Sequence, residues 1–116
     1  MKKYLAVFLG SGDSLEKWRQ LPEEERKLKE QAGFEGWVEW MKNNEKSIVG
    51  EGSPLGKTKS VDKNGISDIK NNLGAWTVVQ AESHEEAAKL FENHPHFMIM
   101  PGSSVEIMEC LEIPKM

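Results

Sequence analysis

Two of the three histidines in the chain, His94 and His96, flank Pro95 in the segment HPHFMIMPGSSVEI. An imidazole titrates near neutral pH, so a histidine can act as a general acid or base, and it is also a common metal ligand. A metal site needs three or four ligands, and no third ligand is marked near this pair. Proton transfer by His94 is therefore a better candidate than metal binding, structural capping of the preceding helix is the leading alternative to both, and we expect neither a metal nor a cofactor.

Two roles for His94 stay open at the level of the sequence. As a catalytic acid or base it needs a carboxylate that orients its ring, and the candidates are Glu82, Asp62 and Glu106. As a structural residue it would lie at the end of the preceding helix, where an imidazolium interacts favourably with the helix dipole. An enzyme would place His94 in a cavity beside a carboxylate, whereas a structural module would place it on the helix end, facing water.

Several aromatic residues and one isolated carboxylate are candidates for a binding cavity. Trp76 follows the glycine of LGAW, which permits close backbone approach, and Glu106 lies in an otherwise apolar strand. Ligand cavities are mostly apolar with a few polar groups, although aromatic residues at regular spacing also form ordinary core and Glu106 also suits a solvent-exposed edge. The predicted binding residues are Tyr4, Trp37, Trp76, His96 and Glu106.

Hydrophobic spacing and turn signals predict the elements that must position these residues. In the long helix, Phe34, Trp37, Val38 and Met41 recur at helical spacing. The dipeptide Asn64-Gly65 predicts a tight turn, and the segment SHEE predicts a capped helix start at residue 83. We expect strands at 4–9, 57–61, 75–81 and 105–113. Helices are expected at 22–46 and 83–93, with Pro95 ending the second, and a further helical turn is expected within 13–21.

This order predicts an α+β, ferredoxin-like β-α-β-β-α-β fold, in which four antiparallel strands carry two helices on one face. Every residue from Tyr4 to Leu9 is apolar, so the first strand presents apolar side chains to both faces of the sheet. The face without helices therefore needs a cover. A second copy of the chain would supply it, so we expect a homodimer with its sheets face to face.

Composition narrows the classes of function. The 116 residues are expected to form a single domain spanning 1–116. A net charge of -4 argues against a nucleic-acid partner, and no segment approaches the length of a membrane span. The opening MKKYLAVFLG is too short in its apolar run for a signal peptide, and the single cysteine, Cys110, excludes an internal disulfide. A cytoplasmic location is the expectation.

The chain also resembles the YCII-related family, known as the DGPF-domain family, over nearly its whole length. The similarity is carried by GSPLGKT, LGAW, AESHEEAAKLF with the HP that follows it, and GSSVEI, in this order and spacing. The resemblance implies a dimeric α/β barrel built from ferredoxin-like protomers. Members of this family include a few enzymes that act on small aromatic or lactone-like molecules.

The chain departs from the family pattern at three places. The DGPF motif is not intact, because the comparable turn reads Asn64-Gly65-Ile66-Ser67. The histidine proposed as catalytic in one branch lies on the first long helix, whereas this chain has no histidine before His84. Met108 and Glu109 stand where an arginine and a proline often follow the last strand. The resemblance therefore carries over the fold better than the catalytic residues.

Together these patterns predict a homodimer that binds a small, partly apolar molecule in a barrel or sheet–helix cavity. Any chemistry would be cofactor-free proton transfer of the isomerase or lyase kind, with His94 as acid or base. The alternative is a non-catalytic ligand-sensing or structural interaction module built on the same dimer.

Overall fold

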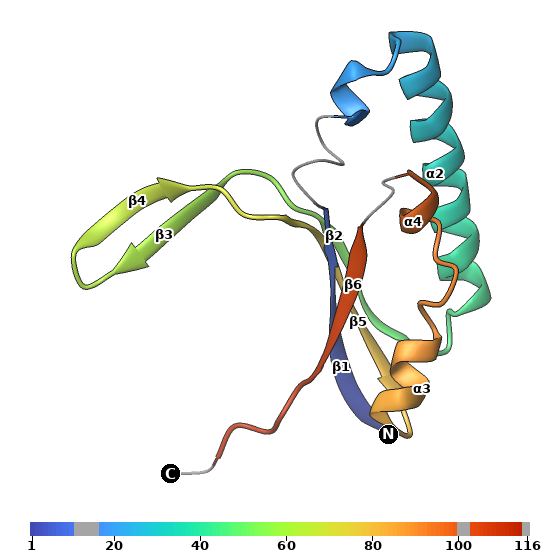
Figure 1. Ribbon diagram of the computed structural model, residues 1–116. Coiled ribbons are helices and arrows are strands. Elements are labelled where there is room, and N and C mark those ends of the chain that lie inside the picture. Colours follow the sequence, from blue (N-terminus) through green and yellow to red (C-terminus); the bar gives the residue numbers. More distant parts are fainter. Residues whose placement is uncertain (11–16, 100–102, 115–116) are drawn as a thin grey trace.

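The computed structural model describes residues 1–10, 17–99 and 103–114, and it confirms the α+β class and the ferredoxin-like order of elements (Figure 1). Two strands and a short helix are present beyond the expected set, and the helical turn expected within 13–21 lies partly outside the described residues. The elements are β1 (Lys2–Leu9), α2 (Glu23–Asn43), β2 (Ile48–Pro54), β3 (Thr58–Asp62), β4 (Gly65–Ile69), β5 (Leu73–Ala81), α3 (His84–Lys89), α4 (His96–Ile99) and β6 (Ser104–Glu109).

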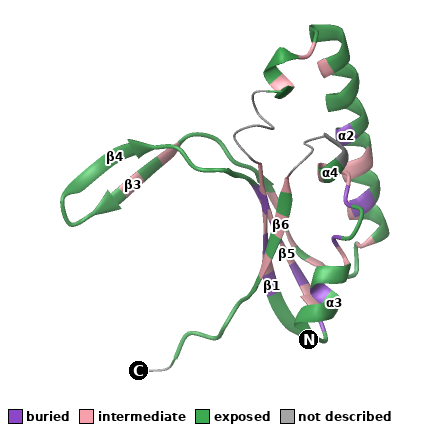
Figure 2. Ribbon diagram, viewed as in Figure 1, coloured by how far each residue is buried: buried purple, intermediate pink, exposed green. Residues whose placement is uncertain are grey.

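A four-stranded antiparallel sheet in the order β2-β5-β1-β6 forms the centre of the protein. The helices lie together on one face of this sheet (Figure 1). Strand alternation divides β1 between the two faces: Tyr4, Ala6 and Phe8 are buried beneath the helices, and the residues between them are half-buried on the opposite face. We call that second face, which no described helix covers, the open face (Figure 2).

The long helix covers less of the core than its sequence pattern predicts. In α2 only Gly33 and Trp40 are buried, whereas Phe34 is 71% exposed and Val38 is 48% exposed. Phe34 and Val38 lie one turn apart, on a different side of α2 from Gly33, Trp37 and Trp40, so they point away from the core. A regular apolar stripe predicts a helix but not which of its apolar residues are packed.

Three element boundaries differ from the expectation. Strand β2 occupies the glycine-rich segment around residues 50–54, whose glycines favour a turn. The segment is extended instead, because it pairs with β5 through an irregular register around Gly50 and Gly52. The second helix ends at Lys89, before Pro95, and the chain then turns through Asn93 with a positive φ of 58°. The last strand ends at Glu109. The predicted cap is confirmed, because the Glu86 N–H donates to Ser83 Oγ at 3.1 Å.

Strands β3 and β4 form a separate two-stranded sheet, Thr58–Ile69, which we call the arm. The arm leaves the main sheet on the side opposite the helices (Figures 1 and 2). Its tip is the predicted Asn64-Gly65 turn, in which the Asn64 N–H donates to Asp62 Oδ1 at 2.7 Å and Gly65 has a φ of 116°.

Candidate functional site

The imidazole of His94 is completely buried on the helix side of the sheet. Aromatic rings surround it: the ring centroids of Trp37 and Trp40 lie 4.7 Å away, and that of Phe8 lies 4.9 Å away. These rings come from α2 and β1, and Phe91 completes the set at 6.1 Å from the turn after α3. The arrangement places one polar side chain inside an aromatic cluster.

Hydrogen bonding determines which nitrogen of His94 carries the proton. The main-chain N–H of His96 donates to His94 Nδ1 at 3.0 Å, so Nδ1 is an acceptor and the proton of the neutral ring lies on Nε2. Nε2 is buried and has no hydrogen-bond partner among the described residues. Burial, reinforced by the nearby charge of His96, lowers the pKa of His94 from 6.5 to about 4. At neutral pH the ring is therefore an uncharged donor.

Neither of the two placements expected for His94 describes its surroundings. The ring does not face water at a helix end, and it is uncharged at neutral pH, so the expected attraction between an imidazolium and the helix dipole is missing. None of the described carboxylates forms a hydrogen bond or ion pair with it either. Asp62 lies on the exposed arm and Glu106 is exposed on β6. The ring instead lies in an apolar enclosure with one free donor.

Three contacts that the sequence did not indicate hold the segment around His94. The Nε1–H of Trp40 donates to the Leu90 carbonyl oxygen at 2.9 Å, which joins α2 to the turn after α3. Nε2 of His96 lies 3.1 Å from the Leu9 carbonyl oxygen at the end of β1. Gly36 lets Pro95 approach α2, because a Cβ at this position would lie 3.1 Å from the proline ring. Such contacts join residues far apart in the chain and carry no local sequence signal.

The predicted site residues divide between the two faces of the sheet. His94 lies with His96 and Trp37 on the helix side. Tyr4 is also buried on the helix side, but its ring stacks on His84 with the centroids 5.1 Å apart. The structure therefore brings three of the predicted residues together and gives Tyr4 a separate contact.

Trp76 and Glu106 belong to the open face. Both are paired with Val7, Trp76 from β5 and Glu106 from β6, so their side chains flank Val7 on one face. Phe8, the next residue in β1, points to the opposite face and contacts His94. One site cannot use both His94 and the Trp76–Glu106 pair, because the sheet separates them.

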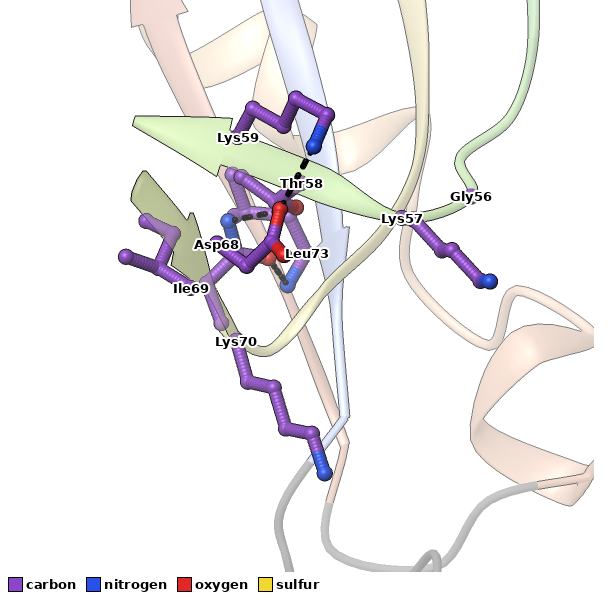
Figure 3. Close-up of a pocket in the computed structure, with 9 residues that line it drawn as sticks. Gly56, Lys57, Thr58, Lys59, Asp68, Ile69, Lys70 and Leu73 are labelled. Atoms are coloured by element: carbon purple, nitrogen blue, oxygen red, sulfur yellow. Dashed lines mark hydrogen bonds and ion pairs between the residues drawn. The ribbon is translucent and has the colours of Figure 1, made fainter. Parts of the chain in front are cut away.

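A hollow of about 860 Å³ lies at the base of the arm (Figure 3). Lys59 turns towards Asp68, with its Nζ 2.7 Å from Oδ1, whereas Lys57 and Lys70 extend away from this pair (Figure 3). The pairing of β3 with β4 brings Lys57 and Lys70, thirteen residues apart in the chain, to the same hollow. The hollow is lined by Gly56, Lys57, Thr58, Lys59, Asp68, Ile69, Lys70, Asn71 and Leu73.

Two kinds of site are absent from the part of the chain that the structure describes. No three histidine, cysteine, aspartate or glutamate side chains in it are grouped so as to hold a metal ion. None of its helices is both long enough and apolar enough to cross a membrane.

Comparison with known proteins gives a match in structure and none in sequence. No family model matches the chain, and no curated protein matches it in sequence. A solved structure of 5-chloro-2-hydroxyhydroquinone dehydrochlorinase from Burkholderia phenoliruptrix AC1100, in complex with 2,5-dihydroxybenzoquinone, is similar with a TM-score of 0.51. The alignment covers 90% of each chain at 18% sequence identity. This likeness supports the ferredoxin-like fold expected from the YCII-related resemblance, and family membership stays a resemblance.

Proposed function

We propose that the chain is a cytoplasmic homodimer that binds a small, ring-shaped and partly apolar molecule at the His94 cluster. The observation that carries the ligand proposal is the buried Nε2–H of His94, which lacks a partner among the described residues. Buried polar groups nearly always have hydrogen-bond partners, and leaving one without a partner costs about 1–3 kcal/mol. A ligand oxygen would accept this hydrogen bond while its ring packs against Trp37 and Phe8.

The geometry favours a hydrogen-bond or proton donor over a general base. His94 Nδ1 is occupied by the His96 N–H, so the ring presents Nε2–H to its surroundings. A neutral imidazole in this state polarises a carbonyl or phenol oxygen, and it donates a proton where negative charge develops. Cofactor-free isomerisation or elimination is the reaction class that needs such a donor. The similar solved structure belongs to a dehydrochlorinase with a dihydroxybenzoquinone bound, which supports a ring-shaped, oxygen-bearing ligand.

The test of this site uses 2,5-dihydroxybenzoquinone as the probe in calorimetric titration. His94→Asn removes Nε2–H, while its amide oxygen retains an acceptor for the His96 N–H. His84→Asn is the matched control, because His84 is exposed and stacks on Tyr4 away from the cluster. We expect the dissociation constant to rise by about tenfold or more in His94→Asn, as for a lost buried hydrogen bond, and to stay unchanged in the control. Equal effects of the two substitutions would remove His94 from the site.

The homodimer is proposed from the composition of the open face. Half-buried or exposed apolar side chains cover it, among them Leu5, Val7, Trp76, Val78 and Met108. A monomeric protein rarely exposes a contiguous apolar patch of this kind, and a two-fold axis would cover it with its own copy.

Sedimentation equilibrium tests the homodimer. We expect the wild-type chain to be dimeric at micromolar concentration and Val7→Lys, at the centre of the open face, to be monomeric. Phe34→Lys is the control, since Phe34 is 71% exposed on α2 and its substitution should leave the dimer intact. A monomeric wild-type chain would overturn this part of the proposal.

A specific observation also favours the second candidate, a non-catalytic ligand-sensing or structural module. His94 has no carboxylate partner among the described residues, and aromatic rings enclose it. Such a module would bind the probe without converting it. Product analysis after prolonged incubation with a panel of hydroxylated and chlorinated quinols separates the two: turnover that is lost in His94→Asn supports the enzyme, and binding without turnover supports the module.

A further inference from the structure

Proton transfer needs a group that removes a proton as well as a donor, and His94 supplies only the donor. Its Nδ1 accepts the main-chain N–H of His96 at 3.0 Å, which leaves Nε2–H as the reactive end of the ring. None of the described carboxylates forms a hydrogen bond or ion pair with this ring. A base for the proposed reaction must therefore come from another side chain beside the aromatic cluster.

His96 has the opposite arrangement of its two ring nitrogens. Its Nε2 lies 3.1 Å from the Leu9 carbonyl oxygen. A carbonyl oxygen only accepts hydrogen bonds, so Nε2 carries the proton of the neutral ring and Nδ1 holds a lone pair. No described group donates a hydrogen bond to this Nδ1. The residue is half-buried, so part of it is open to a bound molecule.

The two imidazoles lie against the same aromatic ring. The ring centroid of Phe8 is 4.9 Å from that of His94 and 5.3 Å from that of His96. Pro95 restricts the backbone between the two histidines, and Gly36 lets the proline ring pack against α2. The N–H donor of His94 and the lone pair of His96 therefore belong to one segment that is fixed at the end of β1.

A second buried polar atom without a partner lies at this end of β1. Within residues 1–10, 17–99 and 103–114, only His94 Nε2 and Ser103 Oγ are buried side-chain nitrogen or oxygen atoms that lack a hydrogen-bond partner. Ser103 precedes Ser104, which pairs with Leu9, and the Leu9 carbonyl oxygen is the atom that His96 contacts. Buried polar groups nearly always have partners, so two unsatisfied groups at one strand end indicate a polar ligand there.

We propose that His96 is the general base of this site, and that the substrate is a cyclic carbonyl compound with a C–H bond next to the carbonyl group. The assignment rests on the ligand site proposed at His94. Nδ1 of His96 takes the proton, the C–H electron pair forms a C=C bond, and the carbonyl π electrons move onto oxygen to give an enolate.

His94 stabilises this enolate, and His96 completes the reaction. The Nε2–H of His94 donates a hydrogen bond to the enolate oxygen, and only the proton on His96 moves. When His96 returns its proton to a different carbon of the conjugated enolate, the carbonyl group forms again and the substrate is isomerised. Nothing is oxidised or reduced, so the reaction needs no further reactant.

The electrostatic interaction between the two histidines supports these roles. Burial, and then the nearby charge of His96, lowers the pKa of His94 to about 4. A proton gained by His96 therefore opposes a second proton on His94. At neutral pH His94 stays an uncharged donor while His96 carries the proton.

Deuterium exchange tests the base with 1-indanone as the probe, a ring ketone with C–H bonds next to its carbonyl group. Proton NMR in heavy water at neutral pD follows the loss of these C–H signals, and calorimetric titration gives the dissociation constant of the probe. His96→Gln places an amide N–H where Nε2 lies, so it keeps the contact with the Leu9 carbonyl oxygen and removes the lone pair of Nδ1. His84→Gln is the matched control, because Nε2 of His84 also contacts a carbonyl oxygen, that of Ile107, at 2.7 Å.

We expect the wild-type chain to exchange 1-indanone faster than buffer alone. His96→Gln should lower the exchange rate at saturating probe by about a hundredfold and change the dissociation constant by less than about threefold. His84→Gln should change neither quantity. A residue that only supports the fold would weaken binding and exchange together, so a loss of exchange with intact binding is specific to a base.

The outcomes separate the base from the ligand site. Binding that depends on His94, with exchange that His96→Gln leaves intact, overturns the base and retains the ligand site. A wild-type chain that binds either 1-indanone or 2,5-dihydroxybenzoquinone but exchanges 1-indanone no faster than buffer overturns the base and favours the non-catalytic module. A wild-type chain that binds neither probe overturns both.

Discussion

The Nδ1 atom of His94 accepts a hydrogen bond from the main-chain N–H of His96 at 3.0 Å. This bond uses the nitrogen that a general base would need, and it leaves Nε2–H as the only donor of a ring that is neutral at pH 7. The proline between the two histidines restricts the backbone and so helps to align the N–H with the ring. The HPH segment thus stabilises the neutral tautomer of His94 that carries its proton on Nε2.

The first prediction concerns stability at acid pH. The pKa of His94 is about 4 in the folded protein, whereas the ordinary value of 6.5 applies to the unfolded chain. Between pH 4 and pH 6.5 the unfolded chain therefore binds more protons than the folded protein. Stability from this group is fully present above about pH 6.5, and it falls as the pH drops towards 4, by at most about 3 kcal/mol. Urea unfolding of wild type and His94→Asn from pH 4 to pH 7 measures this. Parallel stability profiles would show that His94 is not held neutral.

The second prediction concerns the bond between Trp40 and Leu90. Trp40→Phe keeps an aromatic ring but removes the Nε1–H that donates to the Leu90 carbonyl oxygen, and it leaves a small void beside His94. We expect a loss of about 2 kcal/mol in the free energy of unfolding. Phe34→Leu on the exposed face of α2 is the control and should stay within about 0.5 kcal/mol. A Trp40→Phe protein as stable as the control would contradict the bond.

The third prediction compares two glycines near the arm. Gly52→Ala forces a Cβ into the Trp76 carbonyl oxygen at a positive φ, so it should cost about 2 kcal/mol or more. Gly56→Ala meets no atom within 4 Å and should be neutral or stabilising by a few tenths of a kcal/mol. Thermal unfolding of the two variants checks the difference. If both melt alike, the bend at Gly52 is not a strict requirement of the fold.

Local signals in the sequence account for most of the predicted fold. Alternation in β1, the cap at Ser83 and the turn at Asn64-Gly65 depend on neighbouring residues, and all three are present. Strand β2 was missed because its glycines signal a turn locally, whereas pairing with β5 stabilises an extended, bulged strand.

The candidate site could be predicted only in part. The residue types at His94, Trp37 and His96 indicated chemistry, and the structure brings these three together. The sequence could not show that Trp76 and Glu106 lie on the opposite face of the sheet from His94. The face that a side chain occupies in β5 or β6 depends on the strand register.

The ferredoxin-like class followed from the sequence by itself, because helix caps, turns and apolar periodicity act over a few residues. The strand expected at 57–61 was misplaced: it lies in the arm, and β2 takes the corresponding place in the main sheet. Only the tertiary structure decided that His94 is buried and neutral, that Gly36 admits Pro95, and that the arm projects from the sheet. These features depend on desolvation and contact between segments that are distant in the chain. No short stretch of sequence records them.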